Sequence, residues 1–146
     1  MGMTCLFCGI AAGSVPAALV FEDDEIVAFL DTMPIRRGHV QIIPRAHYPY
    51  FEDLPPDLSA RMLALGQRLA RAMKPAYRVK RVGFAFTGGD IAHAHAHVVP
   101  LHEKDDLTSR RYIAEDTVTF TDLPALTPDE AAAVVAELKH GLETGA

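Results

Sequence analysis

Three histidines at alternate positions constrain this chain more than any other feature. They lie in the run His93-Ala94-His95-Ala96-His97-Val98-Val99, where small or β-branched residues fill the other positions. Side chains alternate between the two faces of a β-strand, so a strand over residues 91–99 places all three imidazoles on one face. Burying an imidazole without a polar partner is costly, and three in a row therefore predict a functional site rather than packing alone.

The residues alone leave two other interpretations of this strand open. Histidines at alternate strand positions are able to chelate one metal ion, as in hydrolytic zinc sites with three histidine ligands. The row is also compatible with a solvated, metal-free polar face or an incidental histidine-rich tract.

The periodicity of the chain predicts an α+β fold. A short turn or helix is expected over 5–12, and one apolar stripe predicts a central helix over 55–73, ended by Lys74-Pro75. The run Thr127-Pro128-Asp129-Glu130 resembles a capping box and opens a C-terminal helix that reaches about residue 139. Strands are expected over 18–22, 25–30, 39–44, 82–87 and 91–99. Their order with the helices indicates an antiparallel sheet of about five strands.

Length and charge narrow the class of protein. The 146 residues suit one domain over 1–146, and 49% of them are apolar. A net charge of -5 without a basic stripe argues against a nucleic-acid partner. No apolar run approaches the roughly 20 residues that span a bilayer, so no membrane partner is expected. The first residues lack the features of a signal peptide, and a cytoplasmic location follows as the expectation.

Cys5 and Cys8 are the only cysteines of the sequence. A single pair is too little for a disulfide framework, and in a reducing compartment this spacing is more typical of half a metal site or a redox pair. No βαβ pattern of the thioredoxin kind follows it. Two ordinary buried thiols are the alternative.

The histidine run resembles the His-φ-His-φ-His-φ-φ signature of the histidine triad family of nucleotidyl hydrolases and transferases. The resemblance extends to the opening run Cys5–Ala17, to Phe29-Leu30-Asp31, and to the segment from Gly38 to His47. These segments follow the family order across residues 5–100, whereas 101–146 carry no family signature. Family members are commonly homodimers with sheets that join across a two-fold axis, and the same is expected here.

The resemblance implies a covalent mechanism on a purine nucleotide. His95 is the implied nucleophile, which attacks the α-phosphorus of a nucleoside phosphoramidate or dinucleoside polyphosphate. A backbone carbonyl of the motif is expected to fix its ring, and His97 to contact the phosphate and assist the leaving group. The leaving-group pocket is expected to include part of the C-terminal segment.

The resemblance also implies a nucleotide pocket. Asp31 matches the carboxylate that accepts hydrogen bonds from the ribose, and the base is enclosed by Phe7, Ile10 and Phe29. Gly89 and Asp90 stand where the family often has Gln and Ser. Because an ionised Asp donates no hydrogen bond and repels an anion, a nucleotide-binding protein with little turnover is the second interpretation.

A structural zinc ion is the remaining implication of the resemblance. Some members of the family, and related galactose-1-phosphate uridylyltransferases, complete such a site with two histidines. The matching positions predict zinc ligands at Cys5, Cys8, His47 and His93. His39, at the start of a predicted strand, is interpreted as structural.

Overall fold

One antiparallel sheet of five strands organises the protein. The computed structural model describes residues 5–107 and 123–144, and all statements here refer to them. The strands are β1 (Leu19–Glu22), β2 (Ile26–Leu30), β3 (Val40–Pro44), β4 (Arg81–Phe86) and β5 (Ala96–Leu101). They lie in the order β1-β2-β3-β5-β4, and every neighbouring pair is antiparallel. The predicted α+β class and the antiparallel sheet are confirmed.

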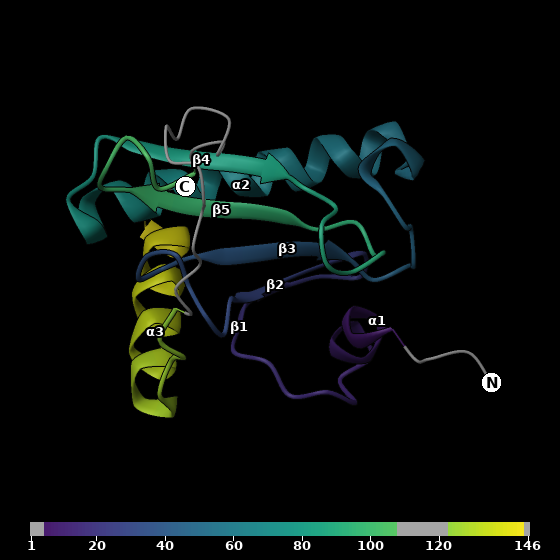
Figure 1. Ribbon diagram of the computed structural model, residues 1–146, viewed down its shortest axis with the longest axis horizontal. Helices are drawn as coiled ribbons and strands as arrows, with labels where there is room; N and C mark the ends of the chain where they lie inside the picture. The colour runs from purple at the N-terminus through teal and green to yellow at the C-terminus, as the bar shows by residue number, and fades with distance from the viewer. Residues whose placement is uncertain (1–4, 108–122, 145–146) are drawn as a thin grey trace, which may run out of the picture.

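Helices cover both faces of this sheet (Figure 1). The long helix α2 (Pro56–Tyr77) and the C-terminal helix α3 (Pro128–Thr144) pack on one face, and the short helix α1 (Leu6–Ala11) packs on the other. A 3-10 turn, η1 (Phe51–Asp53), precedes α2. Both faces of strand β2 are therefore covered. Ile26, Ala28 and Leu30 enter the core under α2, whereas Val27 and Phe29 face α1.

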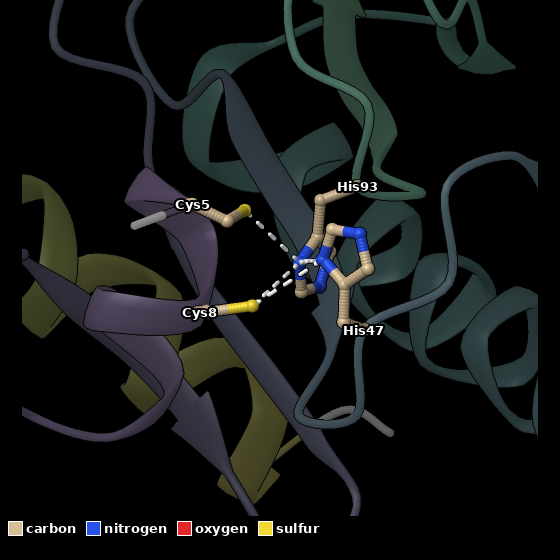
Figure 2. Close-up of side chains that lie close together, drawn as sticks. All are labelled: Cys5, Cys8, His47 and His93. Carbon is tan, nitrogen blue, oxygen red and sulfur yellow. Dashed lines mark hydrogen bonds between the residues drawn. The ribbon is translucent and has the colours of Figure 1, made fainter. Parts of the chain in front are cut away.

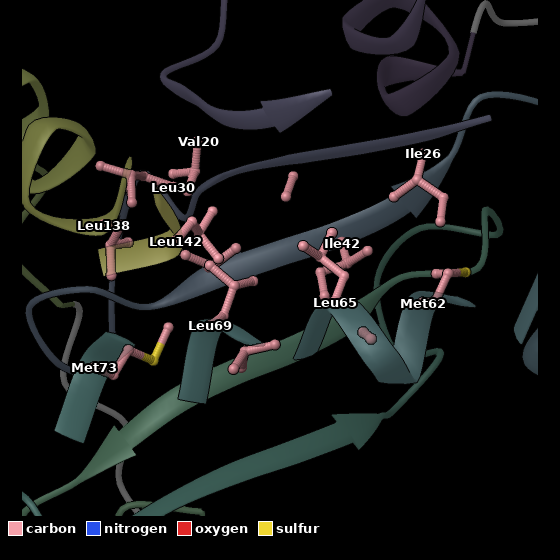
Figure 3. Close-up of a cluster of buried hydrophobic side chains, with 14 of the residues drawn as sticks. Val20, Ile26, Leu30, Ile42, Met62, Leu65, Leu69, Met73, Leu138 and Leu142 are labelled. Atoms are coloured by element: carbon pink, nitrogen blue, oxygen red, sulfur yellow. The ribbon is translucent and has the colours of Figure 1, made fainter. Parts of the chain in front are cut away.

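The predicted apolar stripe of α2 forms the centre of the larger core (Figure 3). Its buried members are Leu58, Met62, Leu65, Leu69 and Met73. The helix does not end at Lys74-Pro75 as predicted, but continues to Tyr77, where Arg78 takes a left-handed conformation. Pro75 lies in the last turn, where it supplies no N–H to the carbonyl four residues earlier, and the helix ends two residues after it. None of the described helices is both long enough and apolar enough to cross a membrane.

Helix α3 begins at the predicted capping box. The backbone N–H of Glu130 donates to the Thr127 hydroxyl, and the Glu130 carboxylate accepts from the Thr127 N–H. The helix reaches Thr144, beyond the predicted end, because Leu138 and Leu142 both enter the core.

The histidine run differs from its prediction. Strand β5 begins at Ala96, so His97 is in the strand while His93 and His95 lie in the preceding turn. The pairing with β3 ends at Ala96, and the Ala94 N–H donates instead to the Tyr48 carbonyl. The predicted alternation still holds, because Ala94, Ala96 and Val98 enter the core under α2, whereas the rings of His93 and His95 meet Phe7 of α1 and the His97 ring lies beside that of His95.

The crossing of α2 and α3 provides a test of this packing. A Cβ at Gly141 would lie 2.4 Å from the Ala72 Cβ and 3.1 Å from its Cα. Glycine to alanine normally stabilises a helix by about 1 kcal/mol. Here we expect Gly141→Ala to lower the free energy of unfolding by about 1–3 kcal/mol, because the helices must separate. Urea denaturation measures it, with exposed Lys139→Ala as control, and stabilisation by Gly141→Ala would contradict the close packing.

Candidate active site and metal centre

Four side chains from three separate segments converge beside α1. Cys5 and Cys8 come from the start of the chain, His47 from the loop after β3, and His93 from the turn before β5 (Figure 2). The Cys8 Sγ lies 3.3 Å from His47 Nδ1 and 3.5 Å from His93 Nδ1. Cys5 Sγ lies 3.5 Å from His93 Nδ1, and the two Nδ1 atoms are 3.3 Å apart. The predicted ligand set is thus assembled in space.

These separations fit a tetrahedral zinc ion. Zinc bonds of about 2.0–2.1 Å to nitrogen and about 2.3 Å to sulfur place two nitrogen ligands about 3.3 Å apart, and a nitrogen and a sulfur about 3.6 Å apart. The four measured distances match these edges, and all four ligand atoms lie within 4.8 Å of one another. The donor set, two thiols and two imidazoles, is that of a closed structural zinc site.

His93 is oriented for this cluster by its other ring nitrogen. Its Nε2–H donates to the Pro44 carbonyl at 2.9 Å, which leaves the Nδ1 lone pair directed at both cysteines. This is the outer contact that fixes the tautomer of a metal-binding histidine. The ring is completely buried, and burial lowers the pKa of His93, so the neutral form is favoured.

His95 has the geometry of a nitrogen nucleophile. Its Nδ1 lies 2.7 Å from the His93 carbonyl oxygen, and because a carbonyl only accepts, Nδ1 carries the proton and donates. The Nε2 lone pair of the neutral ring is thereby free. The expected contact between His95 and a backbone carbonyl of its own motif is present. The ring of Phe7 meets the His95 ring edge-on, with centroids 5.1 Å apart.

His97 faces a different partner, His39. The Ile35 N–H donates to His39 Nδ1 at 3.1 Å, so a neutral His39 carries its proton on Nε2. That Nε2 lies 2.9 Å from His97 Nδ1 and donates to it, which leaves the proton of a neutral His97 on Nε2. Burial lowers the pKa of His39 to about 4 and also lowers the pKa of His97, so both rings are neutral at pH 7.

Asp31 is held next to this pair. The Met33 N–H donates to its Oδ1 at 2.9 Å, and the Gln41 amide donates to its Oδ2 at 2.6 Å. Gln41 pairs with Phe29 on one side and His97 on the other, so the three side chains form a row on the α1 face of the sheet. The Gln41 Oε1 is buried without a hydrogen-bond partner, so this amide is oriented by the carboxylate. Asp31, His39 and His97 also have the spacing of metal ligands, although the hydrogen bond between the rings already accounts for it.

A cleft of about 390 Å³ lies between α1 and the edge of the histidine site. Five predicted nucleotide-binding residues line it, namely Phe7, Ile10, Phe29, Asp31 and Asp90. Its volume lies in the usual range of small-molecule pockets. Gly89 does not line it and lies exposed, with open space around its Cα. A larger cleft of about 460 Å³, between β1 and α3, contains none of the histidines.

Part of the C-terminal segment forms a wall of this cleft. Leu126, Thr127, Pro128 and Ala131 line the same cleft as the nucleotide-binding candidates. The Leu126 N–H fixes this wall by donating to the Thr32 carbonyl at 3.0 Å. The described part of the segment therefore closes the pocket beside Phe29 and Asp31. The predicted contribution of this segment to a leaving-group pocket stays a prediction, and its residues 108–122 lie outside the described residues.

Sequence reasoning missed His39 and Gln41 as members of the site. The sequence shows that both residues belong to one alternating strand segment after Gly38. It does not show that this segment pairs with the strand that carries His97. Gly38 has φ +92° and its backbone packs against Tyr77, where a Cβ would lie 2.4 Å from the ring. A three-histidine metal site is not formed, because no metal-like cluster of the described residues contains His93, His95 and His97 together.

Comparison with known proteins agrees with these features. The model of the HIT domain family matches residues 12–104. The chain is 35% identical over 108 residues to an Arabidopsis thaliana adenylylsulfatase, covering 70% of this chain and 55% of that protein. It is 31% identical over 101 residues to a Saccharomyces cerevisiae adenosine 5'-monophosphoramidase, covering 68% and 64% respectively.

Among solved structures, a zinc-bound histidine triad family protein from Mycobacterium smegmatis is similar over nearly the whole chain. Its TM-score is 0.75 at 31% identity, covering 97% of this chain and 94% of that one. The family model spans well over half of the sequence, including all five strands, α2 and all three histidines. The chain belongs to the HIT domain family.

Proposed function

We propose that this protein is a nucleotidyl hydrolase or transferase that cleaves at the α-phosphate and passes through a nucleotidyl-His95 intermediate. The observation that carries the proposal is the hydrogen bond from His95 Nδ1 to the His93 carbonyl, beside a nucleoside-sized cleft. A neutral imidazole with one nitrogen engaged in this way presents the other as a nucleophile. The purine base is placed against Phe7, Ile10 and Phe29, and the ribose hydroxyls against Asp31.

The chemical step follows from the two tautomers. The His95 Nε2 lone pair attacks the α-phosphorus, the bond from phosphorus to the leaving nitrogen or oxygen breaks, and its electron pair goes to that atom. His97 Nε2–H donates a hydrogen bond to the departing atom, and that atom takes its proton from solvent water, because a neutral imidazole keeps its only N–H at pH 7. Water then attacks the phosphorus of the nucleotidyl-His95, the phosphorus–Nε2 bond breaks, its electron pair returns to His95, and the proton of the attacking water passes to solvent as the nucleoside monophosphate is released. The rings of His95 and His97 are neighbours, with centroids 5.1 Å apart.

Two named relatives support this direction of function. The Arabidopsis relative is an adenylylsulfatase and the yeast relative an adenosine 5'-monophosphoramidase, both named for adenylyl compounds. Asp90 favours the second candidate, a nucleotide-binding protein with little turnover. Its side chain lines the cleft, where a carboxylate repels a phosphate rather than donating to it.

We propose a structural zinc ion for the cysteine and histidine cluster. The cluster fits four-coordinate zinc in ligand type and spacing, and the zinc-bound relative from Mycobacterium smegmatis supports this choice. Cys5 and Cys8 with His47 and His93 would hold the ion. Zinc would supply no reaction step here, but would join the first helix to the turn that carries His95.

The homodimer stays a prediction. Strand β4 is an edge of the sheet and has one paired neighbour, β5. An edge strand presents unpaired N–H and C=O groups that a second copy can pair with. Joining two sheets at this edge is the arrangement that we propose.

His95→Asn tests the nucleophile. The Asn side-chain NH₂ is able to keep the hydrogen bond to the His93 carbonyl, but it offers no Nε2 lone pair. We expect AMP release from adenosine 5'-phosphoramidate to fall by at least about a thousandfold, while AMP binding measured by calorimetry is retained. Acid quench of the wild type should trap AMP on His95.

His140→Asn, at an exposed position on α3, is the matched control and should hydrolyse like the wild type. Substantial turnover by His95→Asn would contradict the covalent mechanism. If the wild type binds AMP but turns over neither the phosphoramidate nor diadenosine tetraphosphate, the binding-protein candidate holds instead.

Removal of a zinc ligand is expected to destabilise the protein. Purified wild type should contain one zinc per chain by plasma mass spectrometry. Cys8→Ser should lose it and unfold at a lower temperature, because a structural zinc site contributes folding free energy directly. Protein that folds with no stoichiometric metal, or a Cys8→Ser variant with wild-type zinc content, would contradict the assignment.

The buried His39 predicts an acid-sensitive fold. Its pKa is about 4 in the folded protein and about 6.5 when unfolded, so the unfolded chain binds more protons between these values. The stability present above pH 6.5 is therefore lost as the pH falls toward 4, at up to about 1.4 kcal/mol per pH unit for this group. Urea denaturation of zinc-saturated protein at several pH values measures the slope.

His39→Asn keeps an acceptor for the Ile35 N–H but does not titrate. The free energy of unfolding should therefore fall less steeply with falling pH in this variant than in the wild type, by the uptake of about one proton. Exposed His140→Asn should keep the wild-type slope. Equal slopes for His39→Asn and the wild type would show that His39 titrates normally in the folded protein.

A further inference from the structure

A second cavity opens on the histidine site, apart from the nucleoside cleft. It has a volume of about 250 Å³ and is lined by Pro49, Tyr50, Phe51, Glu52, Phe86 and His95 among others. None of its lining residues lines the nucleoside cleft. His95 contributes to this cavity and also contacts Phe7, which is a wall of the nucleoside cleft. A phosphate at His95 would thus lie between two separate cavities.

Aromatic rings dominate the second cavity. The ring centroids of Phe51 and Phe86 are 5.8 Å apart, and the ring planes are tilted by 33°. Phe51 is 59% exposed and Tyr50 is 45% exposed. Exposed aromatic side chains that gather around a concave surface are typical of a binding site. Such rings favour an apolar or aromatic group by burial and by edge or offset stacking.

The charge of the cavity is negative. Glu52 is its carboxylate, and no Lys or Arg lines the cavity among the described residues. Asp90, on the loop before His93, is a carboxylate of the neighbouring nucleoside cleft. A dinucleoside polyphosphate would bring several further phosphate charges beyond the α-phosphate, and carboxylates disfavour them.

We propose that the second cavity holds the leaving group and selects nucleoside phosphoramidates of apolar, aromatic amines over dinucleoside polyphosphates. The inference rests on the proposed function, since it needs a substrate attacked by His95. In the step selected, the His95 Nε2–phosphorus bond forms and the phosphorus–nitrogen bond breaks. The nitrogen keeps the electron pair, accepts a hydrogen bond from His97 Nε2–H and takes a proton from solvent water, and the neutral amine leaves past Tyr50 and Phe51.

Three adenosine substrates test the selection on the wild-type protein. They are an N-(2-phenylethyl) phosphoramidate, a phosphoramidate of a polar amine with matched basicity, and diadenosine tetraphosphate with and without Mg²⁺. Matching the basicity removes differences in leaving-group chemistry. We expect kcat/KM for the phenylethyl compound to exceed both others by at least about tenfold. Equal values for the two amines, or tetraphosphate cleavage as efficient as that of the phenylethyl compound, would overturn the proposal.

Two pairs of variants assign the selection to this cavity. Phe51→Ala should bring the ratio of kcat/KM for the aromatic and polar amines close to one, whereas Leu63→Ala, which removes an exposed leucine of α2, should keep the wild-type ratio. Glu52→Lys should raise kcat/KM for diadenosine tetraphosphate, and Glu143→Lys, the same charge change on α3, should not. A ratio unchanged in Phe51→Ala would contradict the placement of the amine.

The outcomes separate this inference from the proposed function. If the polar-amine substrate is cleaved through a trapped AMP-His95 but no aromatic preference appears, the leaving-group selection fails and the proposed function stands. If none of the substrates yields AMP or an adduct, the proposed function fails and the selection fails with it. Size-exclusion chromatography of Phe51→Ala verifies that its assembly state matches the wild type, and the wild-type substrate comparison does not depend on any variant.

Discussion

The position of His93 is the constraint on which the rest of the site depends. Its Nδ1 points into the cysteine cluster, its Nε2–H donates to the end of β3, and its carbonyl accepts from His95. One fully buried residue thus joins the N-terminal helix, the sheet and the nucleophile. An unpartnered imidazole would be costly in this place, so the three contacts are also what makes its burial tolerable.

The two neighbouring histidines obtain their states from different parts of the fold. His95 is fixed by its own motif, through a carbonyl two residues earlier. His97 is fixed from another strand, through His39 and the Ile35 N–H. The result is a free lone pair on one ring and an available N–H donor on its neighbour, which are the two groups that the proposed nucleophilic attack and the stabilisation of a departing atom use. Rings with identical chemistry therefore acquire different roles.

Two separate cavities with different lining residues adjoin the histidine site. Apolar side chains from α1 and β2 line the first cavity, with Asp31 at their edge. The C-terminal segment closes this cavity at Leu126. Aromatic side chains from the loop before α2 and from β4 line the second cavity. Because the cavities share no lining residue, the sites proposed for the nucleoside and for the leaving group can vary independently of each other.

Much of this protein was determined by sequence alone. Local periodicity predicted the five strands, the apolar face of α2 and the capping box of α3, because these depend on neighbouring residues. Motif positions predicted the four cluster residues and the groups around the nucleoside cleft. The division of labour among the histidines was decided by tertiary structure, since β5 starts at Ala96 only where β3 stops pairing. The same holds for His39 and Gln41, whose partners lie on other strands, and for the second cavity, whose rings come from residues 35 positions apart. Their contacts depend on distances across the sheet that no local pattern encodes.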